Sequence, residues 1–149
     1  MIPYLPDMQL KGQLRELIAI MRNWKNKGTP NHLLVNNITE YGTEDFLSYF
    51  EWYSYWYEKR FGKGFNELYI NEVRDFCYSK MSEKLTPYKA LMRIENIYTD
   101  WMNEDYLRVC MANLYEKWKF GQGKNRLKDQ DWAYLLSGYK EITGKDYFI

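Results

Sequence analysis

Residues 7–27, DMQLKGQLRELIAIMRNWKNK, carry the pattern that decides the fold class. Apolar side chains recur in this stretch at steps of three and four residues, which places them on one side of a helix: Leu10, Leu14, Leu17, Ile18 and Met21. Asp7 stands where a helix N-cap is expected, and Gly28 is a stop signal. The stretch therefore predicts an amphipathic helix that begins near Asp7 and ends by Lys27.

Helical periodicity continues through most of the remaining chain. A short element is expected over residues 31–39, and longer helices are expected over residues 43–61, 66–81, 86–98, 103–120 and 129–143. Thr43, Thr86, Asn103 and Asp129 stand where these helices need capping residues. The sequence shows no internal repeat or linker. It therefore predicts an all-α fold, organised as a single compact multi-helix domain over residues 1–149.

The sequence also bears on location and cofactors. No apolar run approaches the roughly 20 residues that a membrane-spanning helix needs, and the first residues lack the basic start of a signal peptide. Cys77 and Cys110 lie in apolar-periodic stretches, which is typical of buried thiols in a reducing compartment. No cluster of His, Cys or Asp has the spacing of metal ligands. We expect a cytoplasmic protein without a metal, a cofactor or a membrane partner.

Positive charge is concentrated in one segment, although the formal net charge is only +1. Residues 117–128, KWKFGQGKNRLK, contain no acidic residue, and Trp118 and Phe120 are interleaved with their cations: Lys117, Lys119, Lys124, Arg126 and Lys128. Cations with interleaved aromatic residues suit contact with a nucleic-acid backbone and stacking on bases. The same composition also fits a helix end followed by a solvated loop, or a surface for an acidic protein partner.

Three blocks of sequence resemble one family. The first block comprises Ile2-Pro3-Tyr4-Leu5-Pro6, Gln9-Leu10, Gly12-Gln13 and Arg15-Glu16. The second comprises His32, Val35-Asn36 and Glu40-Tyr41, and a weaker third comprises Ala112-Asn113-Leu114-Tyr115-Glu116-Lys117. Together the blocks resemble the pyrimidine-dimer DNA glycosylase family, which includes the endonuclease V class of phages and shorter bacterial relatives.

The resemblance implies a helical DNA-repair enzyme, a DNA glycosylase and abasic-site lyase that acts on damaged duplex DNA. In this family an N-terminal α-amine attacks the sugar C1′ and a helix glutamate assists the Schiff-base chemistry, which corresponds here to Met1 and Glu16. The matching arginine, Arg15, would contact a DNA phosphate. The resemblance places further DNA contacts at Gln9, His32, Lys117, Lys119, Lys124 and Arg126.

The chain departs from the family at its N terminus. The arm that precedes the proline-rich start is shorter than in the family, and the bulky Ile2 is expected to keep Met1 in place, so the reacting amine would be that of Met1. On a helix Glu16 has Leu17 and Ile20 as neighbours, which predicts a partly apolar face. The structural alternative is that Glu16 pairs with Arg15 or a nearby lysine at the surface.

Other predicted site residues have structural alternatives as well. His32, the single histidine, fits a helix cap or a core hydrogen bond as well as a contact with DNA. For the whole chain, two functions remain open. One is the glycosylase and lyase. The other is a catalytically inactive, phage-type binding or inhibitor protein that engages a host protein or DNA through an aromatic-basic surface.

Overall fold

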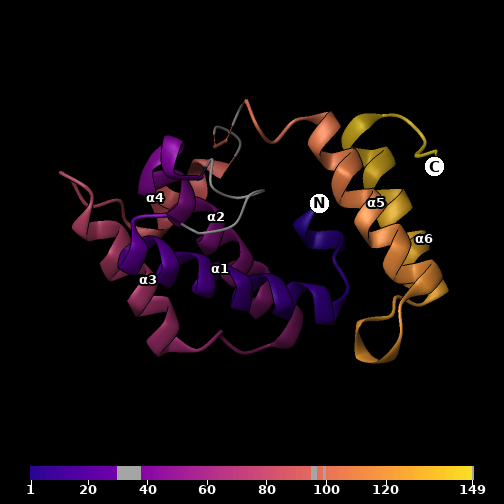
Figure 1. Cartoon of the computed structure of the whole chain (residues 1–149), viewed down its shortest axis with the longest axis horizontal. Helices are drawn as coiled ribbons and strands as arrows, with labels where there is room; N and C mark the ends of the chain where they lie inside the picture. Colours follow the sequence, from indigo (N-terminus) through magenta and orange to yellow (C-terminus); the bar gives the residue numbers. More distant parts are fainter. Residues whose placement is uncertain (30–37, 95–96, 99, 149) are drawn as a thin grey trace. The chain divides into compact units, whose positions relative to one another are not determined.

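The computed structural model describes residues 1–29, 38–94, 97–98 and 100–148 (Figure 1). Within this described part of the chain the regular structure is helical and no strand occurs, which confirms the all-α fold class. The elements are η1 (Ile2–Tyr4), α1 (Asp7–Lys27), α2 (Ile38–Phe61), α3 (Glu67–Ser79), α4 (Pro87–Met92), α5 (Glu104–Phe120), η3 (Gly123–Asn125) and α6 (Asp129–Thr143).

The helices group into two compact units, each with its own buried side chains. The terminal unit consists of Met1–Leu10 and Thr99–Ile149, and the central unit consists of Lys11–Tyr98. The chain therefore enters the central unit within α1 and returns to the terminal unit before α5. The single domain over residues 1–149 stays a prediction.

Helix α2 lies at the centre of the central unit and contacts both α3 and α4. Its side chains Phe46, Leu47 and Phe50 are buried. Trp24 of α1 packs edge-on against Phe46, with 5.9 Å between ring centroids, and against Phe76 of α3, with 5.5 Å. These aromatic contacts join three helices in one core, because large rings bury much apolar area for each side chain.

Two carboxylates of α2 bind arginines of the neighbouring segments. Glu51 is buried and accepts hydrogen bonds from Nε and Nη2 of Arg74 in α3, at 2.6 and 3.1 Å. Asp45 is also buried and accepts from Arg93 Nη2 at 2.8 Å and from the backbone N–H of Tyr98 at 3.2 Å. Both are charge-assisted contacts, which satisfy the carboxylates inside the unit.

In the terminal unit α5 and α6 lie side by side as an antiparallel pair (Figure 1). Met111 and Leu114 of α5 and Leu135 and Tyr139 of α6 are buried. Helix α5 begins after Asn103, whose side chain accepts a hydrogen bond from the Tyr106 N–H at 2.9 Å. This cap and the helix after it agree with the sequence-based prediction.

Two helix boundaries differ from the prediction. Helix α4 ends at Met92, far short of residue 98. The Arg93 side chain and the Tyr98 backbone N–H both bind the distant Asp45, and the positive φ of Tyr98, 49°, is not helical. Helix α6 is capped by Lys128 rather than Asp129, since the Lys128 N–H donates to the Asp131 carboxylate at 2.9 Å.

A third difference concerns the start of α2. Helix α2 begins at Ile38, and two helical segments meet within it at Gly42, where φ is 80° and ψ is 172°. The segment after this kink agrees with the helix expected over residues 43–61, and the Thr43 hydroxyl donates a hydrogen bond to the Cys77 carbonyl at 3.2 Å. Glycine suits position 42 because φ is positive there. Most of the element expected over residues 31–39 lies outside the described residues.

Candidate active site and nucleic-acid interface

The N terminus forms a defined turn. The Tyr4 N–H donates to the Met1 carbonyl at 2.9 Å and the Leu5 N–H donates to the Ile2 carbonyl at 3.1 Å, which closes η1. Pro3 lies at the start of this turn, where no hydrogen-bonded N–H is needed. The α-amine is therefore attached to a folded turn, because the residues that follow it are held in place by backbone hydrogen bonds.

The Met1 α-amine has a perturbed protonation equilibrium. Its partial burial disfavours the ammonium form and lowers its pKa from the ordinary value of 8.0, while the neighbouring Cys110 on α5 has a smaller, opposite effect. An amine with a lower pKa holds more of the free base near neutral pH, which is the nucleophilic form. The chemistry of this end of the chain is therefore compatible with amine attack on a sugar C1′.

The predicted Arg15-Glu16 pair lies on α1 in the central unit. Both side chains are exposed, whereas Leu14 and Leu17 beside them are buried. The Glu16 carboxylate accepts a hydrogen bond from Gln13 Nε2 at 3.2 Å. The expectation of a partly apolar face around Glu16 was wrong, because the buried side of α1 is covered by the leucine positions and Glu16 points away from them.

The other predicted residues near the N terminus have different surroundings. Gln9 is buried, with 9% of its surface exposed, and it belongs to the terminal unit together with Met1. His32 lies outside the described residues. The DNA contacts expected for both residues stay predictions.

The cations of residues 117–128 lie on the terminal unit, and the end of α5 supports them. Lys117, Lys119, Lys124 and Arg126 are all exposed. The Lys117 carbonyl accepts hydrogen bonds from the Gly121 N–H at 3.2 Å and the Leu127 N–H at 3.4 Å. Leu127 is buried, with 1% exposed, so the loop closes back on the helix from which it came.

Gly121 is required by this closure. A Cβ at this position would lie 2.1 Å from the Lys117 carbonyl oxygen, well inside van der Waals contact. The glycine thus lets the backbone of the loop approach the last turn of α5. The loop of the basic segment is consequently held against the end of α5 by backbone hydrogen bonds.

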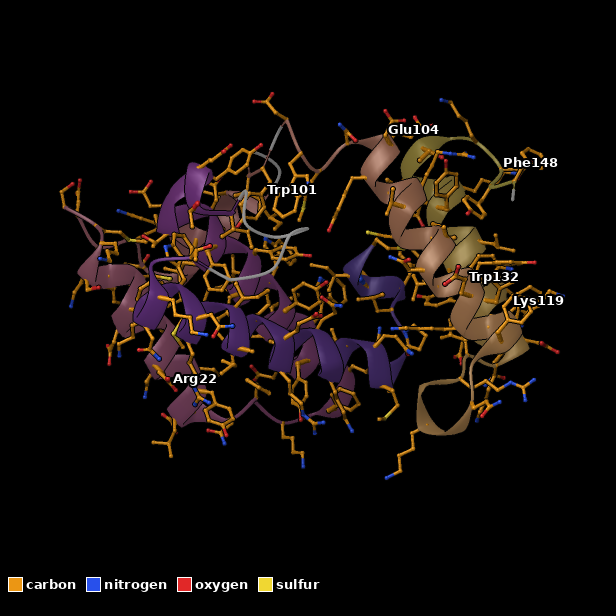
Figure 2. The ribbon with its side chains drawn as sticks, viewed as in Figure 1. Arg22, Trp101, Glu104, Lys119, Trp132 and Phe148 are labelled. Atoms are coloured by element: carbon orange, nitrogen blue, oxygen red, sulfur yellow. The ribbon has the colours of Figure 1, made fainter. Side chains whose placement is uncertain are left out.

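The two aromatic residues of the basic segment differ in their availability. Trp118 stacks on Trp132 of α6, with ring centroids 5.4 Å apart and planes 12° apart, and its Nε1 donates to Asp129 at 2.9 Å. The Lys119 ammonium lies 4.6 Å from the Trp118 ring centroid. Figure 2 labels Lys119, which belongs to α5, and Trp132, which belongs to α6. Phe120, in contrast, is 77% exposed. Phe120 is therefore the solvent-exposed aromatic side chain of this segment.

The cysteines form no disulfide with each other. Cys77 is fully buried, and burial raises the pKa of its thiol to about 12. Cys110 is half-buried and burial also raises the pKa of its thiol, although a hydrogen bond with Tyr106 and the nearby α-amine partly oppose this. Both thiols are thus poorly ionised near neutral pH.

Three further features of the described residues bear on other kinds of site. No group of three or more His, Cys, Asp or Glu side chains lies together as metal ligands would among them. None of the described helices combines the length and the apolar character that crossing a membrane requires. A hollow of about 450 Å³ on the central unit is lined by Tyr55, Glu58, Lys59 and Gly62, and it contains no predicted site residue.

Comparison with known proteins identifies a family similarity at the N-terminal side of the chain. Residues 1–67 match the family model described as pyrimidine dimer DNA glycosylase. The matched part runs from η1 through α1 and α2 to the first residue of α3, and it contains Met1, Arg15 and Glu16. The resemblance inferred from the sequence is confirmed, and it is a similarity to DNA-repair glycosylases. Neither the curated proteins nor the solved structures gave a match.

Proposed function

We propose that this protein is a DNA glycosylase and abasic-site lyase in which the α-amine of Met1 is the nucleophile. The observation that carries the proposal is the family match over residues 1–67, which begins at the residue bearing the amine. The lowered pKa of that amine adds support, because the free base is the reacting form.

The reaction at an abasic site would proceed through a Schiff base. The amine nitrogen bonds to the sugar C1′ aldehyde, and loss of water gives an iminium ion. Removal of a C2′ proton then breaks the C3′–O bond and releases the phosphate, and water finally hydrolyses the imine. At an intact nucleotide, attack at C1′ would also break the bond to the base. We propose Glu16 as the carboxylate that accepts and returns these protons, as the family resemblance implies.

Contact with DNA would come from cations of both units. The exposed Arg15 suits a phosphate contact, since its planar guanidinium can donate two parallel hydrogen bonds to a phosphate. Lys117, Lys119, Lys124 and Arg126 provide a second set of phosphate contacts on the terminal unit, and neighbouring Phe120 adds an exposed ring on which a base could stack. Gln9 and His32 complete the proposed DNA-binding residues.

Borohydride trapping tests the proposal. The chain is incubated with duplex DNA that contains an abasic site or a thymine dimer, and borohydride is added to reduce any Schiff base. We expect a covalent protein–DNA complex, strand cleavage without borohydride, and loss of both in Glu16→Gln. Absence of trapping on both substrates, with duplex binding also absent at low salt, would refute the enzyme and favour a non-catalytic protein with a protein partner.

Arg15→Gln separates binding from chemistry in the same assay. If Arg15 contacts a phosphate, Arg15→Gln should bind the duplex more weakly. At high protein concentration it should still reach the same maximum trapped fraction as the unmodified chain. The matched control is Arg22→Gln, because Arg22 is also exposed on α1 but holds Glu72 through two hydrogen bonds of 2.9 Å.

A further inference from the structure

We propose that Tyr4, Gly138 and Glu141 form an N-terminal clamp that positions the α-amine of Met1. Tyr4 belongs to η1, whereas Gly138 and Glu141 belong to α6. The inference rests on the proposed function, since positioning the amine matters if the amine is the nucleophile. In this view the three residues are positioning residues, which act through η1 and do not touch the DNA.

The contact between η1 and α6 is specific for the Tyr4 side chain. The Tyr4 hydroxyl donates a hydrogen bond to the Glu141 carboxylate. The Tyr4 ring lies 5.0 Å from the ring of Tyr134, also on α6, with the planes tilted by 52°. One aromatic side chain thus makes both an apolar contact and a polar contact with the same helix, which suits tyrosine better than other residues.

Gly138 makes room for this ring. Gly138 is buried in α6, and a Cβ built there would lie 2.4 Å from Cγ of Tyr4 and 2.7 Å from both Cδ atoms. The ring therefore occupies the space that any other residue at position 138 would need. Glycine inside a helix is normally unfavourable, so its presence here is explained by the close approach of Tyr4.

A short, closed turn connects the clamp to the amine. The Tyr4 N–H binds the Met1 carbonyl at 2.9 Å, and Pro3 between them has a fixed φ. The amine at the far end lies near Cys110 of α5, which itself hydrogen-bonds Tyr106. The titratable groups near this turn include Cys110 and Tyr106 from α5, and Tyr134 and Glu141 from α6.

Release of Tyr4 should expose the amine to water. Desolvation is the larger cause of the lowered amine pKa, so an undocked turn should return the pKa towards 8.0. This gives a readout that does not depend on catalysis. The pKa can be measured from the pH dependence of acetic anhydride labelling of the α-amine, followed by mass spectrometry of the N-terminal peptide.

The test uses Gly138→Ala, Tyr4→Ala and Glu141→Ala in the full chain. Gly12→Ala is the matched control, because Gly12 is also helical and a Cβ there would meet nothing within 4 Å. We expect the amine pKa to rise towards 8.0 in the three clamp variants and to stay unchanged in the control. Trapping on abasic duplex at neutral pH should fall several-fold in the same three variants.

The outcomes separate the clamp from the proposed function. An unchanged amine pKa in folded Tyr4→Ala and Glu141→Ala would overturn the clamp, whatever the trapping result. A raised pKa in chains whose parent shows no trapping would support the clamp and refute the proposed function. If Gly138→Ala does not fold, the amine pKa of Glu141→Ala tests the clamp instead. Glu141 is exposed, so we expect its replacement to leave the helix intact.

Discussion

The Met1 amine and the Cys110 thiol influence each other within the terminal unit, and burial acts on them in opposite directions. Burial lowers the pKa of the amine and raises the pKa of the thiol. Both changes have one physical cause, since a low-dielectric environment disfavours whichever form is charged. The result is a larger fraction of free amine beside a thiol that is ionised less than usual, which favours the amine as the nucleophile.

Because the pKa of the Met1 α-amine is lower in the folded chain, the free energy of unfolding should increase with pH. Between its lowered folded pKa and the ordinary 8.0, the unfolded chain binds more protons than the folded chain. The free energy of unfolding should therefore rise with pH across that window and level off above it. Urea denaturation of the native chain and of an N-terminally acetylated chain, compared from pH 6 to pH 9, measures this contribution. Parallel pH profiles for the two chains would contradict it.

The two cysteines should differ in reactivity. Cys77 has a pKa of about 12 against an ordinary 9.0, so it holds roughly a thousandfold less thiolate at pH 8 than an unperturbed thiol. It is also fully buried, whereas Cys110 is half-buried. We expect iodoacetamide to modify Cys110 first and Cys77 only on unfolding, as followed by peptide mass spectrometry. Equal rates in the folded protein would be inconsistent with the buried Cys77.

At the scale of elements, the helices follow local sequence signals closely. The Asn66 and Thr86 side chains accept hydrogen bonds from the N–H groups of Tyr69 and Lys89, as capping residues should. Such signals are readable from sequence because donor and acceptor lie three residues apart. The end of α4 was not predictable, since it depends on Asp45, which lies far away in the chain.

The buried ion pair between α2 and α3 should be asymmetric in its energetic effects. The side chain of Glu51 is 5% exposed and that of Arg74 is 30% exposed. Arg74→Leu leaves an uncompensated buried carboxylate and should cost about 3–5 kcal/mol of unfolding free energy. Glu51→Gln should cost less, about 1–2 kcal/mol, because the remaining arginine still reaches water and the amide keeps one acceptor.

Urea denaturation checks this order, with the exposed pair Arg22–Glu72 as the control. Its side chains are 47% and 32% exposed, so Arg22→Leu should change stability much less than Arg74→Leu. A larger loss for Glu51→Gln than for Arg74→Leu would contradict this expected order.

Two glycines in helices should respond oppositely to alanine. Gly12→Ala should stabilise the protein by about 0.5–1 kcal/mol, because alanine loses less backbone entropy in a helix and the Cβ meets nothing. Gly138→Ala should destabilise it by about 1–3 kcal/mol through the clash with Tyr4. Thermal melts followed by circular dichroism distinguish the two, and stabilisation by both substitutions would argue against the packing of Tyr4 on α6.

At the scale of the whole molecule, the net charge is only +1, but positive charge is concentrated in one segment. The cations of residues 117–128 lie together on the terminal unit. Each phosphate contact releases counterions, so the logarithm of the binding constant falls with the logarithm of salt concentration by roughly 0.9 for each contact. Fluorescence anisotropy with an abasic duplex should therefore give a shallower salt slope for Lys119→Gln/Lys124→Gln, by roughly up to 1.8.

A matched double neutralisation controls for net charge. Lys63→Gln/Lys80→Gln removes the same charge from exposed positions of the central unit and should leave the slope nearly unchanged. If both double variants reduce the slope equally, the basic segment has no special role in binding.

The site was less predictable than the fold, for reasons that concern tertiary contacts. The family resemblance implied Met1 and Glu16, and the composition of residues 117–128 indicated the basic segment. Nothing in the sequence indicated that Trp118 is engaged by Trp132 while Phe120 is exposed, since the stack joins two helices. The packing of Tyr4 on Gly138 spans nearly the full chain and was likewise invisible.

The most direct test of the proposed function is to locate the covalent bond to DNA. After borohydride trapping on an abasic duplex, nuclease and protease digestion followed by tandem mass spectrometry identifies the modified residue. We predict that the sugar remnant is attached to the α-amine of Met1. Attachment to a lysine side chain, with the α-amine unmodified, would contradict the assignment of the nucleophile.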